Sequence, residues 1–119
     1  MTPHLGIDVV DIGLFRVHVA KKNLIFLEKI FTKHELQYCL STEDPAPHLA
    51  GRFAAKEAVV KALYSAGLSC PDFSVIEVVR SQEGIPTIVF NSSMYQDIHV
   101  QISISHAKEI ATAVAMLSK

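Results

Sequence analysis

The chain has 119 residues, a net charge of −1 and a hydrophobic fraction of 50%. A chain of this length holds one domain, because two hydrophobic cores of stable size would not fit in it. The balanced charge excludes a general nucleic-acid-binding protein, and apolar runs far shorter than the roughly 20 residues of a membrane span exclude a transmembrane helix.

The first predicted element is a strand over residues 5–12, which read LGIDVVDI. The run is apolar and rich in β-branched residues, so we expect a buried strand. Gly6 permits a close approach of the strand backbone to a neighbouring element. Asp8 interrupts the apolar run, and neither packing nor strand propensity explains a carboxylate at this position.

Helical segments are predicted next. Residues 13–30 carry mixed apolar and basic side chains in a helical pattern that breaks near Asn23. Thr32 and Glu35 have the spacing of a capping box, in which each side chain bonds the backbone amide of the other residue. A helix over residues 33–41 is therefore expected to follow.

A long helix is predicted after residue 48. The segment 41–48 holds two prolines and two acidic residues and is expected to be a loop. The helix continues to about Ala66, with Gly67 as its C-terminal signal. On a helical wheel, one face carries small and aliphatic residues suited to tight packing on a sheet. These residues are Ala55, Ala58, Val59, Ala62 and Leu63.

Beyond residue 67 the apolar pattern changes from a period of about 3.6 to a period of about 2, which predicts strands. A turn at Gly84 joins the first predicted hairpin, and Ser92 or Ser93 is expected to cap a short helix before the second. The predicted strands cover residues 73–81, 85–90, 99–105 and 110–119. Together with the helices before them, they indicate an α+β domain.

The predicted chemistry centres on two carboxylates, Asp8 and Glu57. An acid inside an apolar strand costs several kcal/mol unless it has a partner, and a divalent cation shared with Glu57 would be one such partner. Carboxylates without a nearby cysteine or histidine cluster favour Mg²⁺, which binds one or two carboxylates, waters and phosphate oxygens. Glu57 also precedes Lys61 by four residues, in the favourable orientation for a helix ion pair. The helix face is therefore either part of a metal site or a solvated surface with one salt bridge.

Basic side chains surround Glu57 in the sequence. Arg52, Lys56 and Lys61 would hold phosphate groups around the cation, because phosphoryl transfer depends mainly on positioning and charge neutralisation. His106 follows the strand ISIS at the head of a turn. It is either simply exposed or forms a hydrogen bond to a phosphate or a reacting hydroxyl.

Composition also bears on assembly and location. So high an apolar fraction in a small chain predicts a symmetric homo-oligomer that buries the excess apolar surface. The N-terminal residues MTPHLGID lack the basic and apolar regions of a secretory signal. Cys39 and Cys70 have neither metal-binding nor redox spacing, so we expect buried thiols in a reducing cytoplasm.

Several sequence blocks, taken in order, resemble one enzyme family. The blocks GIDVVDI, FTKHEL, GRFAAKEAVVKA, EGIPTI and ISISHAKEIATAVAML are similar to those of holo-[acyl-carrier-protein] synthases, the small bacterial 4′-phosphopantetheinyl transferases. The resemblance implies a single domain of this fold over residues 1–119, with an antiparallel sheet packed against a long central helix and shorter helices. It also implies a homotrimer with active sites between subunits.

The activity that the resemblance implies is the transfer of 4′-phosphopantetheine from coenzyme A to a serine of apo-acyl carrier protein. This reaction releases adenosine 3′,5′-bisphosphate and serves fatty acid biosynthesis. Asp8 and Glu57 fall on the magnesium-binding positions of the family, and Arg52, Lys56 and Lys61 fall in the block that lines the coenzyme A site. We expect Lys61 to stabilise the leaving phosphate and a metal-ordered water, or one of the two carboxylates, to accept the serine proton.

The resemblance also bears on positions outside the metal site. His106 is expected to be a substrate contact rather than the base. Many members of the family carry an arginine where this chain has Leu14, and residues 64–66 replace a glycine-threonine-glycine loop near the nucleotide. The residues expected to dock the acidic carrier protein are therefore Arg16, Lys21 and Lys22.

Two other functions are open at this point. A Mg²⁺-dependent phosphohydrolase would use the same carboxylates and basic residues, with water as the acceptor. A trimeric binding module would use Glu57 only to pair with Lys61, and Asp8 would then need a purely structural partner.

Overall fold

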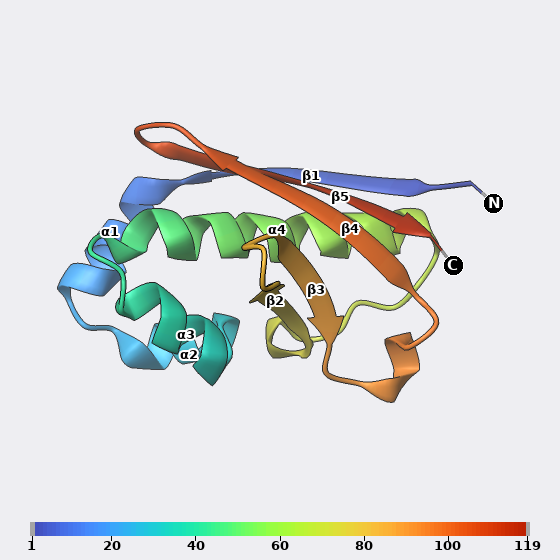
Figure 1. Ribbon diagram of the computed structural model, residues 1–119, viewed down its shortest axis with the longest axis horizontal. Helices are drawn as coiled ribbons and strands as arrows, with labels where there is room; N and C mark the ends of the chain where they lie inside the picture. The colour runs from blue at the N-terminus through green and yellow to red at the C-terminus, as the bar shows by residue number, and fades with distance from the viewer. Residues whose placement is uncertain (1, 119) are drawn as a thin grey trace.

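The structure is a computed structural model, and it describes residues 2–118. Its longest element, helix α4 (Pro45–Ser65), crosses the middle of the molecule, which measures 43 × 27 × 27 Å (Figure 1). A three-stranded antiparallel sheet with the order β1-β5-β4 covers one side of α4. Its strands are β1 (His4–Asp11), β4 (His99–His106) and β5 (Ile110–Ser118).

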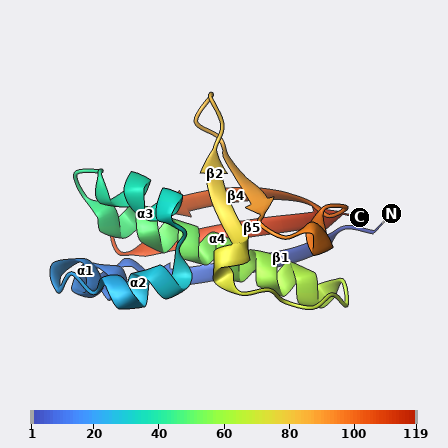
Figure 2. The same ribbon diagram turned by 90° about the horizontal axis from the view of Figure 1, so that it is seen from below.

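Three shorter helices gather around the N-terminal half of α4 (Figure 1). They are α1 (Ile12–Ala20), α2 (Leu24–Ile30) and α3 (Lys33–Leu40). A separate two-stranded sheet projects from the body as a hairpin of β2 (Ile76–Arg80) and β3 (Pro86–Phe90) (Figure 2). Single turns of 3₁₀-helix at Phe73–Val75 and Ser93–Tyr95 precede and follow it. This arrangement confirms the predicted α+β fold with a central helix.

Strand β1 packs directly on α4 because Gly6 has no side chain. A Cβ atom at Gly6 would lie 1.8 Å from the carbonyl oxygen of Ala58, far inside contact distance. The predicted small-residue face of the helix is confirmed, since Ala55, Ala58 and Ala62 are fully buried. Strand β5 faces the helix with alanines at alternate positions, namely Ala111, Ala113 and Ala115. This close packing brings the backbone at Asp8 next to α4.

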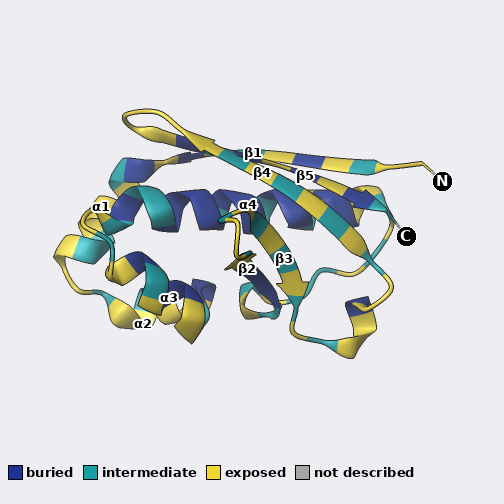
Figure 3. Ribbon diagram, in the orientation of Figure 1, coloured by how far each residue is buried: buried dark blue, intermediate teal, exposed yellow. Residues whose placement is uncertain are grey.

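Strand β1 is buried on one side only (Figure 3). Gly6 and Val10 face the helix, and the alternate side chains point away from it. The prediction of a buried strand is therefore wrong for one of its two faces, because α4 covers a single side of the sheet. We call the uncovered apolar surface the outer sheet face. Its exposed residues are Leu5, Ile7 and Val9 of β1 with Val114 and Met116 of β5.

Some element boundaries differ from the prediction. Helix α4 begins at Pro45, inside the predicted loop over 41–48, because a proline in the first helical turn has no amide donor to satisfy. It ends as predicted, with Gly67 at a φ of 74°. Strand β2 begins at Ile76 instead of residue 73, because the residues before it turn to follow α4. Lys119, the predicted end of the last strand, lies outside the described residues.

The predicted helix break near Asn23 and the predicted capping box of Thr32 and Glu35 are confirmed. The side chain of Asn23 caps α2 by accepting a bond from the amide of Phe26. Thr32 Oγ1 accepts a bond from the Glu35 amide at 3.2 Å, and Glu35 Oε1 accepts one from the Thr32 amide at 2.8 Å. None of the helices in the described part of the chain is long and apolar enough to cross a membrane.

Candidate functional site

Asp8, Glu57 and Lys61 meet where β1 lies on α4. Lys61 extends from α4 towards β1, where its ammonium group donates to Asp8 Oδ1 at 3.2 Å and to the Ile7 carbonyl oxygen at 2.9 Å. The Asp8 side chain is 16% exposed and the Lys61 side chain is 52% exposed, so the carboxylate is recessed and the ammonium group is accessible. The predicted ion pair between Glu57 and Lys61 is wrong in this structure, because Lys61 bonds Asp8 instead.

The pKa of the Glu57 carboxyl group depends on the charge of Asp8. Burial raises the pKa of Glu57 above its ordinary value, the negative charge of Asp8 raises it further, and Lys61 lowers it. The two carboxylates are therefore close enough to repel each other. A divalent cation held between them would relieve this repulsion.

The donor set of this region fits Mg²⁺. The described residues contain no group of three or more His, Cys, Asp or Glu side chains that could hold a metal ion. Mg²⁺ does not need such a cage, because it binds proteins through one or two carboxylates and completes its shell with waters and substrate phosphates. Asp8 and Glu57 supply that number of ligands.

Lys56 has a structural role. Its fully buried ammonium group donates to the Ile30 carbonyl oxygen at 2.8 Å, to Glu35 Oε1 at 2.6 Å and to the Phe73 carbonyl oxygen at 2.9 Å. An ammonium group has three donors, so none is left for a phosphate. The prediction that Lys56 binds coenzyme A is therefore wrong. Lys56 ties α2, α3 and the turn before β2 to α4.

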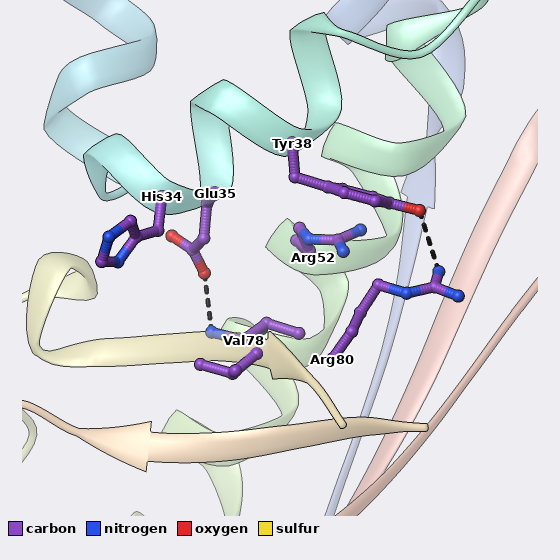
Figure 4. A pocket seen from close by; sticks show the side chains of 7 residues that line it. His34, Glu35, Tyr38, Arg52, Val78 and Arg80 are labelled. Atoms are coloured by element: carbon purple, nitrogen blue, oxygen red, sulfur yellow. Dashed lines mark hydrogen bonds between the residues drawn. The ribbon is translucent and has the colours of Figure 1, made fainter. Parts of the chain in front are cut away.

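Arg52 lies on a different face of α4 from Glu57. Their separation of five positions corresponds to about 140° around the helix axis. Arg52 is 7% exposed, its Cζ lies 4.6 Å from the centre of the Tyr38 ring, and Nη1 donates to the His48 carbonyl oxygen at 3.4 Å. It lines a cavity of about 170 Å³ between α3, α4 and β2 (Figure 4).

His106 lies on the Arg52 side of the molecule. It is exposed at the end of β4, and this strand contacts α4 near Gly51, where an added Cβ would lie 2.9 Å from the Ile104 side chain. Burial lowers the pKa of His48, and the positive charges of Arg52 and His106 lower it further. The predicted site residues thus separate into an acidic half-site, Asp8 with Glu57 and Lys61, and a basic half-site, Arg52 with His106.

The predicted docking residues lie on α1 and the turn after it. The guanidinium group of Arg16 is bonded to both carboxylate oxygens of Asp44, at 3.0 and 3.1 Å. Lys21 and Lys22 are exposed, and Lys22 has a φ of 52° in the turn between α1 and α2. Two lysines are therefore open to a partner, while the arginine is held within the chain.

Tyr38 and Arg80 line the cavity beside Arg52 and were missed by sequence reasoning. Tyr38 follows Glu35 by three residues, and this spacing puts both on one face of α3. It is the one pattern in the sequence that could have pointed to Tyr38. Arg80 Nη1 donates to Tyr38 Oη at 2.9 Å across 42 residues of sequence. No local pattern marks such a pair, because it arises only when β2 packs beside α3.

Comparison with known proteins extends over nearly the whole chain. The family model of the 4′-phosphopantetheinyl transferase superfamily matches residues 4–115. A holo-[acyl-carrier-protein] synthase of Protochlamydia amoebophila is 40% identical, with 99% of each chain covered. Among solved structures, an ACPS–CoA complex of Chronobacterium ammoniagenes has a TM-score of 0.82 at 28% identity, covering 98% of this chain and 97% of that one. The Helicobacter pylori holo-[acyl-carrier-protein] synthase in complex with coenzyme A has a TM-score of 0.81 at 30% identity, covering 96% and 99%.

Proposed function

The chain belongs to the 4′-phosphopantetheinyl transferase superfamily, and on this premise we propose that it transfers 4′-phosphopantetheine from coenzyme A to a serine of apo-acyl carrier protein. The serine oxygen forms a bond to the β-phosphorus of coenzyme A, and the bond from this phosphorus to the bridging oxygen breaks. Adenosine 3′,5′-bisphosphate leaves, and the serine loses its proton. The relatives that are holo-[acyl-carrier-protein] synthases, and the neighbours that bind coenzyme A, support this reaction.

The observation that carries the proposal is the acidic half-site, in which Asp8 and Glu57 repel each other across the contact between β1 and α4. These two carboxylates would hold Mg²⁺ between them. When bound, the cation would neutralise charge on the diphosphate as the reaction proceeds. Within residues 2–118, Lys61 is the one positive charge that acts on both the half-buried Glu57 and the recessed Asp8 when no cation is bound.

Lys61 and Glu57 have separate tasks in the proposed reaction. The Lys61 ammonium group is half exposed, so it can leave Asp8 and donate to the oxygens of the departing phosphate. We assign Glu57, acting through a water molecule, as acceptor of the serine proton.

The two half-sites support a shared active site between subunits. They lie on different faces of α4, so one coenzyme A molecule would contact the acidic half-site of one subunit and the basic half-site of its neighbour. The outer sheet face supports association, because its five apolar side chains are 39 to 63% exposed in a single chain. We propose a homotrimer in which this face is covered.

The carrier protein would dock on α1. Asp11 caps this helix three residues after Asp8, so the surface of α1 adjoins the acidic half-site. Lys21 and Lys22 would attract the acidic carrier, and Arg16 would exchange Asp44 for a carrier carboxylate. Modification of this carrier would serve fatty acid biosynthesis in the cytoplasm.

Mass spectrometry of the carrier tests the proposal. Incubation of the protein with Mg²⁺, coenzyme A and apo-acyl carrier protein should add one phosphopantetheine to the carrier. Asp8→Asn and Glu57→Gln should each lower the rate at least about 100-fold without loss of fold. Phosphate release without carrier modification would instead support the phosphohydrolase, and no reaction by folded protein would support the binding module.

A further inference from the structure

Glu57 is flanked on α4 by two residues that the fold holds tightly. On one side, the Lys56 ammonium group is fully buried and donates to three acceptors from other segments, at 2.6 to 2.9 Å. On the other side, the Ala58 backbone packs closely on β1, where a Cβ atom at Gly6 would lie 1.8 Å from the Ala58 carbonyl oxygen. Neighbouring residues of a helix differ in direction by about 100°, so Lys56 and Ala58 together fix the direction of Glu57.

The partner of this ammonium group, Glu35, is itself fixed by the backbone. Glu35 is 1% exposed, and its Oε1 accepts a bond from the Lys56 ammonium group at 2.6 Å. The same oxygen accepts a bond from the Thr32 amide at 2.8 Å, and Oε2 accepts one from the Val78 amide at 2.7 Å (Figure 4). Backbone amides of the α3 cap and of β2 thus set the position of the carboxylate. Lys56 is therefore bonded to a group that does not move with α4.

Stability by itself does not account for this buried ion pair. Burial of the pair costs the hydration of both charges, and apolar residues of similar volume often replace such a pair without loss of stability. Apolar contacts set no direction, however, whereas hydrogen bonds do. The three bonds of Lys56 hold α4 in one rotation relative to α2, α3 and the turn before β2. What the pair supplies is this single rotation.

The rotation of α4 decides whether Glu57 can share a cation with Asp8. A carboxylate about 6 Å from the helix axis moves by about 2 Å when the helix turns by about 20°. Mg²⁺ binds its ligands at about 2.0–2.1 Å in near-ideal octahedral geometry, so a shift of this size would weaken its binding. Asp8 and Glu57 also repel each other when no cation is bound, and this repulsion favours a rotation that separates them. The helix has to be held against that rotation.

We propose that Glu35 is a positioning residue that acts through Lys56 to hold Glu57 in its metal-binding direction. This role rests on the proposed function, because the cation is the one that Asp8 and Glu57 would share. Glu35 is buried and its carboxylate oxygens are occupied by other donors, so it supplies no ligand to the cation. Loss of Glu35 should therefore weaken the binding of the cation while both of its ligands remain.

Titration with Mn²⁺ tests this role, because Mn²⁺ prefers the same oxygen ligands as Mg²⁺ and its free concentration is measured by electron paramagnetic resonance. Glu35→Gln should raise the Kd for Mn²⁺ about tenfold, the lower end of the effect of residues that orient metal ligands. The Mg²⁺ concentration that gives half the maximal rate of carrier modification should rise by the same factor. Glu77→Gln is the matched control, because the buried Glu77 carboxylate bonds the Thr32 side chain instead of Lys56. It should leave both values unchanged.

A second variant separates positioning from stability. Glu35→Gln/Lys56→Met removes both buried charges, and the glutamine amide keeps an acceptor for a backbone amide and a donor for a carbonyl group that Lys56 leaves. We expect this protein to unfold at about the wild-type temperature and still to bind Mn²⁺ about tenfold more weakly. If either variant is folded and binds Mn²⁺ with wild-type affinity, or if neither folds, the pair has only a structural role and the positioning role of Glu35 is overturned.

Failure of the proposed function gives different results. If the folded wild type binds no Mn²⁺, or if Asp8→Asn leaves its Kd unchanged, the assigned metal site is wrong and the role of Glu35 falls with it. If the wild type binds Mn²⁺ through Asp8 but modifies no carrier, only the transfer reaction is wrong. The Kd values of the Glu35→Gln and Glu77→Gln variants then still decide the role of Glu35.

Discussion

The carboxyl group of Glu57 is held in an unfavourable environment in the free protein, and its proposed role accounts for this. It is half-buried beside another carboxylate, and its pKa is raised by both effects. Residues that bind cations commonly have this property, because the charges that attract the ion repel each other when the ion is absent. At the scale of single residues, the carboxylate of Glu57 should therefore be needed for activity and should lower the stability of the metal-free protein.

Glu57→Gln should raise the melting temperature of the metal-free protein at pH 7 while it removes activity. The pKa of Glu57 is higher in the folded state than in the unfolded state, so between these two values the folded protein binds more protons. The stability of the wild type consequently falls as the pH rises through this window. The advantage of the variant should vanish near pH 3, where the carboxyl group is protonated in both states. Calorimetry in a chelator at both pH values tests this, and an equal or lower melting temperature at pH 7 would contradict it.

The two cysteines should differ sharply in reactivity. Cys39 is fully buried, and burial raises its pKa to about 11, so its thiol is protonated at pH 8. Cys70 is only half-buried, so the prediction of two buried thiols is wrong for this residue. Iodoacetamide at pH 8 should modify Cys70 in the native protein and Cys39 at least about 100-fold more slowly. Peptide mass spectrometry measures both rates, and equal rates would show that the core around Cys39 opens readily.

At the scale of elements, α4 connects both half-sites to the rest of the fold. Local signals in the sequence predicted the helix break near Asn23 and the capping box at Thr32, because such signals depend on residues within one helical turn. The start of α4 at Pro45 was missed, since prolines mark both loops and first helical turns. The role of Lys56 was also missed, because its partners come from three other segments of the chain. The sequence predicted that Asp8 would lie near Glu57 of the long helix, but not that Arg52 would lie on a different face of this helix from Glu57.

Gly6→Ala tests the contact between β1 and α4. The added methyl group would lie 1.8 Å from the Ala58 carbonyl oxygen, so the strand would have to move away from the helix. We expect a loss of about 3 kcal/mol in the free energy of unfolding, at the upper end for overpacking, and a large loss of activity as Asp8 shifts. Gly13→Ala is the control, because its methyl group would meet the Asp11 side chain at 3.1 Å and no backbone atom is nearer. Denaturant unfolding measures the stability of both variants. Equal free energies of unfolding for Gly6→Ala and Gly13→Ala would contradict the close packing of β1 on α4.

At the scale of the whole molecule, the outer sheet face is an apolar surface that a single chain leaves exposed to solvent. Ile7 and Val9 are 63 and 61% exposed on an edge strand, beside Val114 of the neighbouring strand. An exposed apolar surface on an edge strand favours uncontrolled association unless a defined partner covers it. The proposed trimer covers this surface and brings the two kinds of half-site together.

Ile7→Lys should dissociate the trimer. A charge in the centre of the outer sheet face would be buried without a partner in the assembly, so we expect monomers in sedimentation velocity and a loss of activity of at least about 100-fold. Met94→Lys is the matched control, because Met94 is 76% exposed and lies outside this face. A fully trimeric Ile7→Lys protein would place the subunit interface elsewhere.

Subunit complementation tests most directly the central claim that one coenzyme A molecule is held by an acidic and a basic half-site from neighbouring subunits. Glu57→Gln and Arg52→Gln chains are produced separately and together, and carrier modification is measured at a coenzyme A concentration far below KM. Each variant alone should be inactive, while mixed trimers should regain up to about one quarter of the wild-type activity, because random mixing leaves that share of interfaces with both half-sites intact. No recovery in mixed trimers that are folded and as stable as the wild type would contradict the account.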